Sequence, residues 1–237
     1  LPRGQAVTLL DEDFHPAWHS NLVTCAPDGD NNLRLTFAKS VPEWVEEGTP
    51  VEPQEWLPDS LHIANCTYRS TGRFGILLRI PNALIENCLF EDNAAGIHIG
   101  GEWSPGYWLE STNPQNVEIR NCTFRRNHLD MRYGGSKMDV AIDVASWMGS
   151  RKAPGPMRNI RIHDNIFEDE TLCVSLQNCS DVWFWNNTLK DCGQDLKCDP
   201  ASTANVHPDG VGQGSFDRGG FYRPLAFEDR KLFILLV

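Results

Sequence analysis

The sequence has little positive charge and no long apolar run. Its 21 Lys and Arg residues stand against 32 Asp and Glu residues, a formal net charge of −11 at pH 7. Proteins that bind nucleic acid through its phosphates need a basic face, so the composition argues against that class of partner. The apolar stretch Leu232–Val237 is far too short to cross a bilayer. We therefore expect neither a nucleic-acid partner nor a membrane span.

Several motifs with well-defined chemistry are also absent. The sequence holds no glycine-rich phosphate loop, no His-Glu-x-x-His motif and no Cys-x-x-Cys pair. It has no nucleophile elbow, although this leaves a Ser-His-Asp triad open. The acidic run at 28–32 lacks the spacing of an EF-hand and is interpreted as a polar turn. We expect no metal and no cofactor.

What the sequence does contain is one ten-residue phrase written five times. Each copy alternates apolar and variable positions, then has Asn or Asp, Cys or Asn, and finally an aromatic residue or Leu. The alternation predicts a strand, and recurrence at steps of 22, 34, 43 and 22 residues predicts a solenoid with inserted loops. The copies begin at Leu61, Ala83, Val117, Ile160 and Val182.

A second strand follows each of the first four copies. We expect the coils to stack about 4.8 Å apart as a right-handed parallel β-helix, because no coil can bury its apolar side alone. The fold class predicted is therefore all-β. The second strands are Gly75–Leu78, Gly96–Ile99, Ala141–Val144 and Cys173–Leu176.

Stacking in register places equivalent residues in columns. Ile63, Ile85, Ile119 and Ile162 should form one inward column. The repeated Asn or Asp should lie at a turn, where such side chains bond backbone groups, and form an amide ladder. The cysteines 66, 88 and 122 should stack directly behind that ladder.

Two outward features are open to a functional interpretation. His98 and Asp143 should be neighbours on successive coils, either as a polar pair on a solvated face or as an acid/base or sugar-binding pair. The sequence also has eight Trp residues. Trp183 and Trp185 should point outward, where they either stack on sugar rings or cover the coil junctions.

We divide the chain into three parts. Residues 1–57 are predicted to form a β appendage with strand-like runs at Val7–Leu10 and Leu33–Phe37. Residues 58–190 form the β-helix. Residues 191–237 lose the pattern and form a C-terminal cap or packing arm.

Two features favour an extracytoplasmic protein. The chain opens on Leu1 rather than Met, so we expect that a leader was removed and the protein secreted or luminal. Cys192 and Cys198 bracket a short polar loop that is interpreted as a local disulfide, whereas the column cysteines can be reduced. Sequons begin at Asn65, Asn121, Asn178 and Asn186, but three of them coincide with the predicted turn ladder, where a buried Asn could not carry a glycan.

Three segments carry a resemblance to a known family: EPQEWLPDSLHIANCTYRSTGRFGILLRI, ALIENCLFEDNAAGIHIGGEWSPGYWLES and NVEIRNCTF. They resemble the α-1,3-galactosidase family of β-helical glycoside hydrolases. The coverage is about residues 1–190. The family's catalytic aspartates lie on earlier coils and have no counterpart upstream of Leu61, and its Gly-Asp is Gly101-Glu102 here. The matching residues are Arg73, Gly75, Glu86, Asn87, Gly101, Tyr107, Trp108, Glu110 and Ser111.

The resemblance implies a carbohydrate-active protein that recognises galactose-type terminal sugars. Hydrolysis of a glycosidic bond ordinarily needs two carboxylates flanking it. The candidates for that role are Glu102 and Asp143, which we expect at one edge of the stack, with Asp139, Glu118 and Glu110 as further carboxylates. The candidate substrate-binding residues are Arg73, His98, Trp103, Tyr107, Trp108 and Glu110. The alternative is a non-catalytic structural subunit that binds a protein partner through its end coils or its C-terminal arm.

Overall fold

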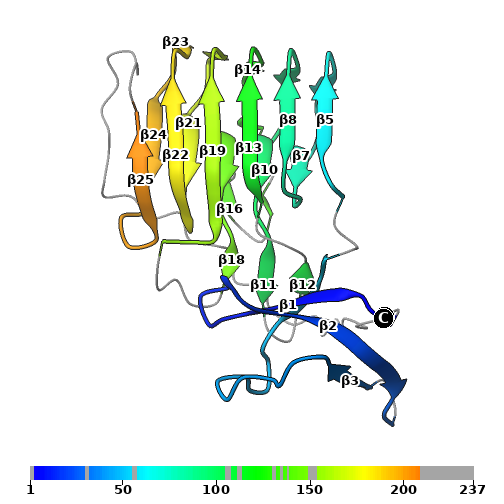
Figure 1. Ribbon diagram of the computed structural model, residues 1–237. Helices are drawn as coiled ribbons and strands as arrows, with labels where there is room; N and C mark the ends of the chain where they lie inside the picture. Colours follow the sequence, from blue (N-terminus) through cyan, green and yellow to red (C-terminus); the bar gives the residue numbers. More distant parts are fainter. Residues whose placement is uncertain are drawn as a thin grey trace.

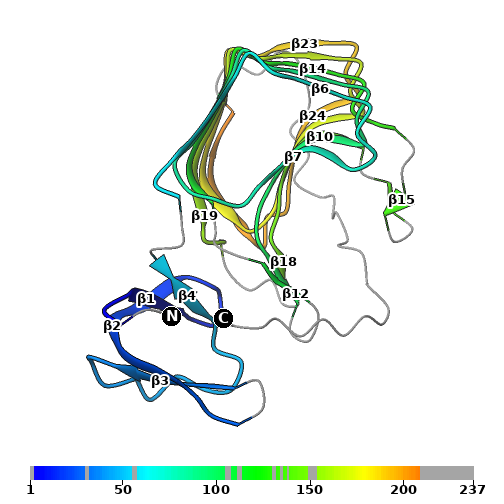
Figure 2. The ribbon, with the colours of Figure 1, turned by 90° about the vertical axis from the view of Figure 1, so that its right-hand side faces the viewer.

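The protein is a parallel β-helix with a small β unit at its N-terminal end (Figure 1). The coils superimpose as a tube with a sheet on each of three sides (Figure 2). The predicted fold class is therefore confirmed. The computed structural model describes residues 3–29, 32–54, 58–104, 108–110, 114–129, 132–133, 136–137, 139–148 and 154–208.

Each coil carries three strands, because the phrase that we interpreted as one strand bends in its middle. Sheet 1 holds the first half of each phrase: β5 (Leu61–Ala64), β8 (Ala83–Glu86), β13 (Gln115–Arg120), β19 (Met157–His163), β22 (Cys179–Trp185) and β25 (Thr203–His207). Sheet 2 holds the second half: β6 (Thr67–Arg69), β9 (Leu89–Glu91), β14 (Thr123–Arg125), β20 (Ile166–Glu168) and β23 (Thr188–Lys190). Sheet 3 holds β7 (Phe74–Leu78), β10 (Ala95–Ile99), β17 (Val140–Val144), β21 (Leu172–Leu176) and β24 (Gln194–Cys198).

The bend between sheets 1 and 2 lies at the repeated Asn or Asp. Residues 65, 87, 121, 164 and 186 have φ between 51° and 57°, a left-handed backbone that Asn and Asp tolerate. The four asparagines among them are exposed, so the predicted amide ladder does not form there as a buried row. Three of the four sequons are thus exposed, whereas Asn178 is wholly buried.

The buried amide ladder forms one residue later instead. Asn165 and Asn187 continue the inward column of cysteines, and the Asn165 Nδ2 donates to Asn187 Oδ1 at 3.1 Å. The backbone N–H of Cys122 donates to Asn165 Oδ1 at 2.9 Å. The amides of Asn165 and Asn187 also donate to the carbonyls of Ile119 and Ile162, which pairs polar groups that burial would otherwise leave unsatisfied.

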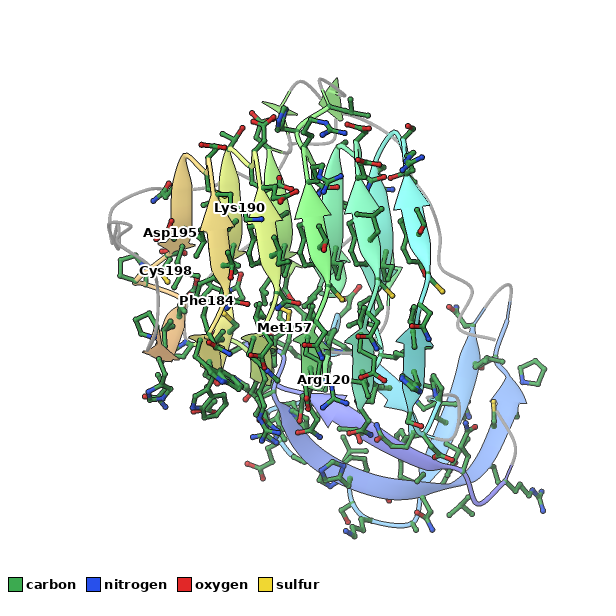
Figure 3. All side chains as sticks on the ribbon, turned by 90° about the horizontal axis from the view of Figure 1, so that it is seen from above. Arg120, Met157, Phe184, Lys190, Asp195 and Cys198 are labelled. Carbon is green, nitrogen blue, oxygen red and sulfur yellow. The ribbon has the colours of Figure 1, made fainter. Side chains whose placement is uncertain are left out.

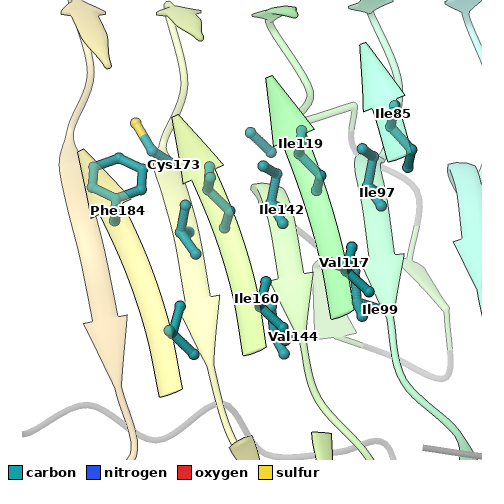
Figure 4. Packing of buried hydrophobic residues seen from close by; sticks show 14 of the residues in the cluster. Ile85, Ile97, Ile99, Val117, Ile119, Ile142, Val144, Ile160, Cys173 and Phe184 are labelled. Atoms are coloured by element: carbon teal, nitrogen blue, oxygen red, sulfur yellow. The ribbon is translucent and has the colours of Figure 1, made fainter. Parts of the chain in front are cut away.

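The core consists of the predicted inward columns. Ile63, Ile85, Ile119 and Ile162 are successive register partners, which confirms that column, and Figure 4 shows part of the packing. On the inner face of sheet 2 four aromatic rings stack with centroid distances of 5.0, 4.9 and 5.0 Å. Those rings belong to Tyr68, Phe90, Phe124 and Phe167.

The β-helix runs further than predicted. β24 and β25 pair in parallel with β21 and β22, so the coils continue to His207 rather than ending at residue 190. The ten-residue pattern is no longer recognisable in this last coil, although Val206 still pairs with Val182. Residues 209–237, the rest of the predicted cap or arm, lie outside the described residues.

Residues 3–54 form the predicted β appendage. Its strands β1 (Ala6–Leu10), β2 (Pro16–Pro27), β3 (Leu33–Phe37) and β4 (Val51–Pro53) make an antiparallel sheet of order β3-β2-β1-β4. Two inserts of the β-helix contribute β11 (Glu102–Ser104), β12 (Trp108–Glu110) and β18 (Trp147–Met148), which form a small sheet on the side facing this appendage (Figure 2). A further insert forms the hairpin of β15 (Arg132–Tyr133) and β16 (Ser136–Lys137).

Cys192 and Cys198 form no disulfide, so the predicted bond between them is wrong. Cys192 lies at the corner between β23 and β24, whereas Cys198 is the last residue of β24 and is buried in the core. The short separation of Cys192 and Cys198 in the sequence suggested the disulfide. The extended strand β24 lies between them and keeps the two residues apart.

Candidate functional site

The outer face of sheet 3 carries a column of successive register partners that includes His98 and Asp143. His98 lies beside Asp143, as predicted, and its Nδ1 is 2.9 Å from Asp143 Oδ2. The column consists of Leu77, His98, Asp143, Ser175 and Lys197.

The pair is buried rather than solvated. The side chains of His98 and Asp143 are 1% and 0% exposed, so the interpretation of a polar pair on a solvated face is wrong. Their covering includes Phe74, whose ring stacks on the imidazole with centroids 4.9 Å apart. Phe74 belongs to an apolar cluster separate from the main core, formed with Ala95 and Val140.

Arg73 adds a cation to this arrangement. Its guanidinium carbon lies 5.0 Å from the centroid of the Phe74 ring, a cation–π distance. Arg73, Phe74, His98 and Asp143 therefore form a continuous series of contacts across adjacent coils, which we call the sheet 3 stack. It unites three of the sequence-predicted site residues.

The sequence did not indicate Phe74. Strict alternation counted back from the outward Leu77 would place residue 75 outward and residue 74 inward. In the structure Gly75 faces the interior, where a Cβ would lie 2.7 Å from the Gly96 carbonyl oxygen and 2.9 Å from the Phe90 ring. The strand thus departs from period two at its first residues, and Phe74 reaches the outer face.

The pair has the geometry of an oriented general base or hydrogen-bonding group. When Nδ1–H donates to Asp143, the imidazole presents Nε2 as its acceptor. The second oxygen of Asp143, Oδ1, is buried and has no hydrogen-bond partner among the residues that the structure describes. A buried acceptor without a donor is costly, so a hydroxyl donated to this oxygen would be stabilising.

A glycine brings the ends of β10 and β17 unusually close beside this pair. A Cβ on Gly100 would lie 1.9 Å from the carbonyl oxygen of Ala145 and 3.4 Å from His98 Nε2. Any side chain there would collide with backbone. Gly100 therefore permits the chain to leave sheet 3 directly beside the imidazole and to enter β11.

Four of the predicted residues lie in the hairpin that follows. The backbone pairs Glu102 with Glu110 and places Trp103 opposite Leu109 and Trp108 opposite Ser104. Glu102 also pairs with Trp147 of β18, so β11 and β18 continue the adjacent strands β10 and β17. Glu102 thus follows the strand that lies next to the one carrying Asp143. Tyr107 lies outside the described residues.

The structure does not bring all the candidates together. Arg73 precedes β7, whereas Glu102 comes after the opposite end of β10, with the His98–Asp143 pair between them. Glu118 lies on sheet 1, where its Oε1 is 3.0 Å from Arg120 Nη1 and 3.3 Å from His163 Nε2. Glu118 therefore takes part in a separate charge network.

That network covers the outer face of sheet 1, where Figure 3 labels Arg120. The hydrogen bond from Arg120, followed by that from His62, lowers the pKa of the Glu86 carboxyl. A shallow cavity of about 290 Å³ lies on this sheet between Leu84, Glu118 and Arg161, away from the sheet 3 stack. Ala83, Leu84 and Val117 line this cavity beside polar residues, whereas sheet 3 carries a buried His–Asp pair, so we take sheet 3 as the candidate site.

The two outward tryptophans of sheet 1, Trp183 and Trp185, pack against side chains of the neighbouring coils. The Trp183 ring stacks on His207 at 5.3 Å, and the Arg161 guanidinium lies 5.9 Å from its centroid. The Trp185 ring stacks on His163 at 4.1 Å. Sugars stack on ring faces, and these faces already contact neighbouring side chains. Of the two interpretations, the structure favours covered coil junctions.

Fold and site together define a repeat protein of stacked β-coils with an oriented His–Asp pair on one side. Residues 56–207 match the family model described as "Right handed beta helix region", and the chain belongs to that family. A search of curated proteins finds no match. Within the described part of the chain there is no helix long and apolar enough to cross a membrane. The described residues also hold no cluster of three or more His, Cys, Asp or Glu side chains suited to a metal ion.

Proposed function

We propose that the protein is a secreted carbohydrate-binding β-helix that recognises galactose-type terminal sugars at the sheet 3 stack. The hydrogen-bonded His98–Asp143 pair carries this proposal. A sugar offers hydroxyl groups and an apolar C–H face. The stack supplies a guanidinium, an imidazole and a carboxylate, and the neighbouring Leu77, at 39% exposure, supplies apolar surface.

Asp143→Asn should weaken the binding of methyl α-galactoside at least tenfold, measured by titration calorimetry. The amide keeps the shape of the carboxyl group but loses the charge that orients His98 and accepts hydroxyl donors. Asp164→Asn is the matched control, because Asp164 also contacts a histidine, at 2.6 Å, but lies at the bend between sheets 1 and 2, away from sheet 3. Equal affinity of Asp143→Asn and the parent chain, both folded by circular dichroism, would remove sheet 3 as the sugar site.

Glycoside hydrolysis is the stronger form of the proposal, with Glu102 and Asp143 as the two carboxylates. The continuation of β10 and β17 into β11 and β18 supports it, because Glu102 then follows the strand next to the one that carries Asp143. The parent chain should then release galactose from an α-1,3-linked digalactoside, and a Glu102→Gln/Asp143→Asn variant should not. Binding without release by the parent chain would limit the function to recognition.

A structural role is the second proposal, and the burial of the pair favours it. Side chains with 1% and 0% exposure are typical of a group that fixes neighbouring coils. In that case the chain would serve as a non-catalytic subunit that binds a protein partner through its end coils. The parent chain would then show no affinity for the galactoside in the same calorimetry.

A further inference from the structure

The last coil of the β-helix is incomplete among the residues that the structure describes. β25 pairs with β22 and extends sheet 1 by one strand, whereas β23 and β24 are the last strands of sheets 2 and 3 (Figure 1). No described strand pairs with the outer edges of β23 and β24. Because an unpaired edge presents a row of backbone donors and acceptors, this end of the stack can bind two further strands.

The side chains at this edge are less buried than their counterparts on the inner coils. Phe124, Phe167 and Leu189 are successive register partners on the inner face of sheet 2. Both rings are 0% exposed, but Leu189 is only partly buried. The next residue, Lys190, has 53% of its side chain exposed. A strand added to β23 would cover Leu189 and extend the core by one layer.

The outer face of sheet 2 carries a column of ion pairs that alternates in sign. Arg125 forms salt bridges with Glu91 at 3.2 Å and with Glu168 at 2.7 Å. At one end of the column Arg69 pairs with Glu91, and at the other end Lys190 pairs with Glu168 at 2.9 Å. Opposite charges on adjacent strands stabilise a sheet, and like charges destabilise it. A strand added beside β23 should therefore carry a carboxylate next to Lys190.

A stretch of sequence beyond the described residues has the pattern that this edge requires. Residues 226–229 are AFED, whereas β9 and β20, each with the residue that follows it, are LFED and IFED. The acid in third place is the carboxylate of the ion column, and the Asp in fourth place is the left-handed bend, with φ of 54° at Asp92 and 52° at Asp169. LFILL at 232–236 begins three residues after Asp229, as LCVSL of β21 begins three residues after Asp169.

We propose that the unpaired edges of β23 and β24 bind residues 226–236 of the same chain, which complete the coil that β25 begins. In the register of the repeat, Phe227 lies beside Leu189 and covers it. Glu228 lies beside Lys190 and accepts a hydrogen bond from its ammonium group. The aromatic column then ends on a ring, and the ion column ends on a carboxylate.

The same register extends sheet 3. Leu196 and Cys198 of β24 are the register partners of the buried Val174 and Leu176 of β21. By the same spacing Ile234 lies beside Leu196, and Leu236 lies beside Cys198. Residues 208–225 connect β25 to the added strands. Inserts that lengthen the repeat from 22 to 34 and 43 residues occur on earlier coils, so the stack accommodates a connection of this length.

Carbodiimide cross-linking of the full chain tests this register, because the reagent joins an amine to a carboxylate that contacts it. Trypsin releases Glu228 in peptide 219–230, since Arg223 precedes a proline. We expect this peptide bonded to Lys190 in the monomer, with tandem mass spectra that place the bond at Glu228. The product of Lys190 with Glu168, 2.9 Å away, is the internal positive control. Lys190→Arg should lose both products, and Asp229→Asn should keep both.

Hydrogen exchange measures the added strand of sheet 3 independently. The amides of residues 232–236 should exchange at least about 100-fold more slowly in the parent chain than in a synthetic peptide 226–237. Glu228→Lys places a second cation beside Lys190 and should reduce this protection at least about tenfold. Asp229→Asn is the matched control, because Asn also tolerates the left-handed bend and should preserve the protection.

Three results would overturn the proposal. In the first, the product of Lys190 with Glu168 forms without the product of Lys190 with Glu228. In the second, peptide 219–230 is joined to Lys190 only in covalent dimers, which would assign the edge to a second copy of the chain. In the third, residues 232–236 exchange as fast as the synthetic peptide. None of these measurements depends on sugar binding.

Discussion

Replacing Phe124 with alanine should lower the free energy of unfolding by about 3–5 kcal/mol, the usual cost of removing a buried phenylalanine. Phe124 is 0% exposed and stands in the middle of the aromatic stack, with Phe90 at 4.9 Å and Phe167 at 5.0 Å. The substitution removes two ring contacts and leaves a cavity between coils that the fixed strand spacing prevents from closing. Urea unfolding followed by circular dichroism measures the loss.

Leu189→Ala is the matched control for this prediction. Leu189 occupies the same column on the coil of β23, where it pairs with Phe167, but it is only partly buried. Its truncation should cost clearly less, because part of the lost contact is replaced by water. Equal losses for Phe124→Ala and Leu189→Ala would show that the aromatic stack does not concentrate stability in the middle coils.

Glu170→Gln should remove most of the pH dependence of stability between pH 5 and 7. Burial raises the pKa of Glu170 to about 8, against an ordinary value of 4.5. The folded protein therefore keeps a proton that the unfolded chain releases above pH 4.5. This stability is fully present below pH 4.5 and is lost as the pH rises towards 8. From pH 4.5 to 7 the parent chain should lose on the order of 3 kcal/mol.

Glutamine cannot ionise, yet its amide oxygen can still accept the hydrogen bonds that Asn127 donates to Glu170. Glu168→Gln is the control, because hydrogen bonds from Lys190 and Arg125 lower the pKa of Glu168, so that it titrates below this window. We expect the slope of unfolding free energy against pH to fall only in Glu170→Gln. A slope equal to that of the parent chain would contradict the raised pKa.

The columns of the β-helix could be predicted because each copy of the phrase repeats the same bend and the same alternation of inward and outward residues. An Asn or Asp at each bend supplies the left-handed residue, and alternation then decides which neighbours face the core. The pairing of His98 with Asp143 followed from the same register. The repeated Asn or Asp was expected at a turn, but the second half of the phrase was not recognised as a strand of its own. Its inward residues, such as Cys88 and Phe90, are out of phase with Ala83 and Ile85 in the first half.

The candidate site was predicted only in part. Arg73, His98 and Asp143 are united by Phe74. Alternation would place Phe74 inward, but Gly75 takes the inward position, where only a residue without a Cβ fits. Glu102, Trp103, Trp108 and Glu110 share one small sheet, but nothing in their spacing indicated that β11 pairs with β18. The inserted loops do not repeat in the sequence. Which of their strands pair therefore depends on where the adjacent coils place the two ends of each loop.

The sequence by itself determined the coil, its register and its inward columns, because equivalent positions of a repeat become neighbours whenever the repeat stacks. Only the tertiary structure decided that His98 and Asp143 are buried. Their covering includes Phe74, which stands at a different position of the repeat and stacks on the imidazole. The period of the sequence fixes which residues become neighbours within a column, but it carries no information about what covers the outer face of that column.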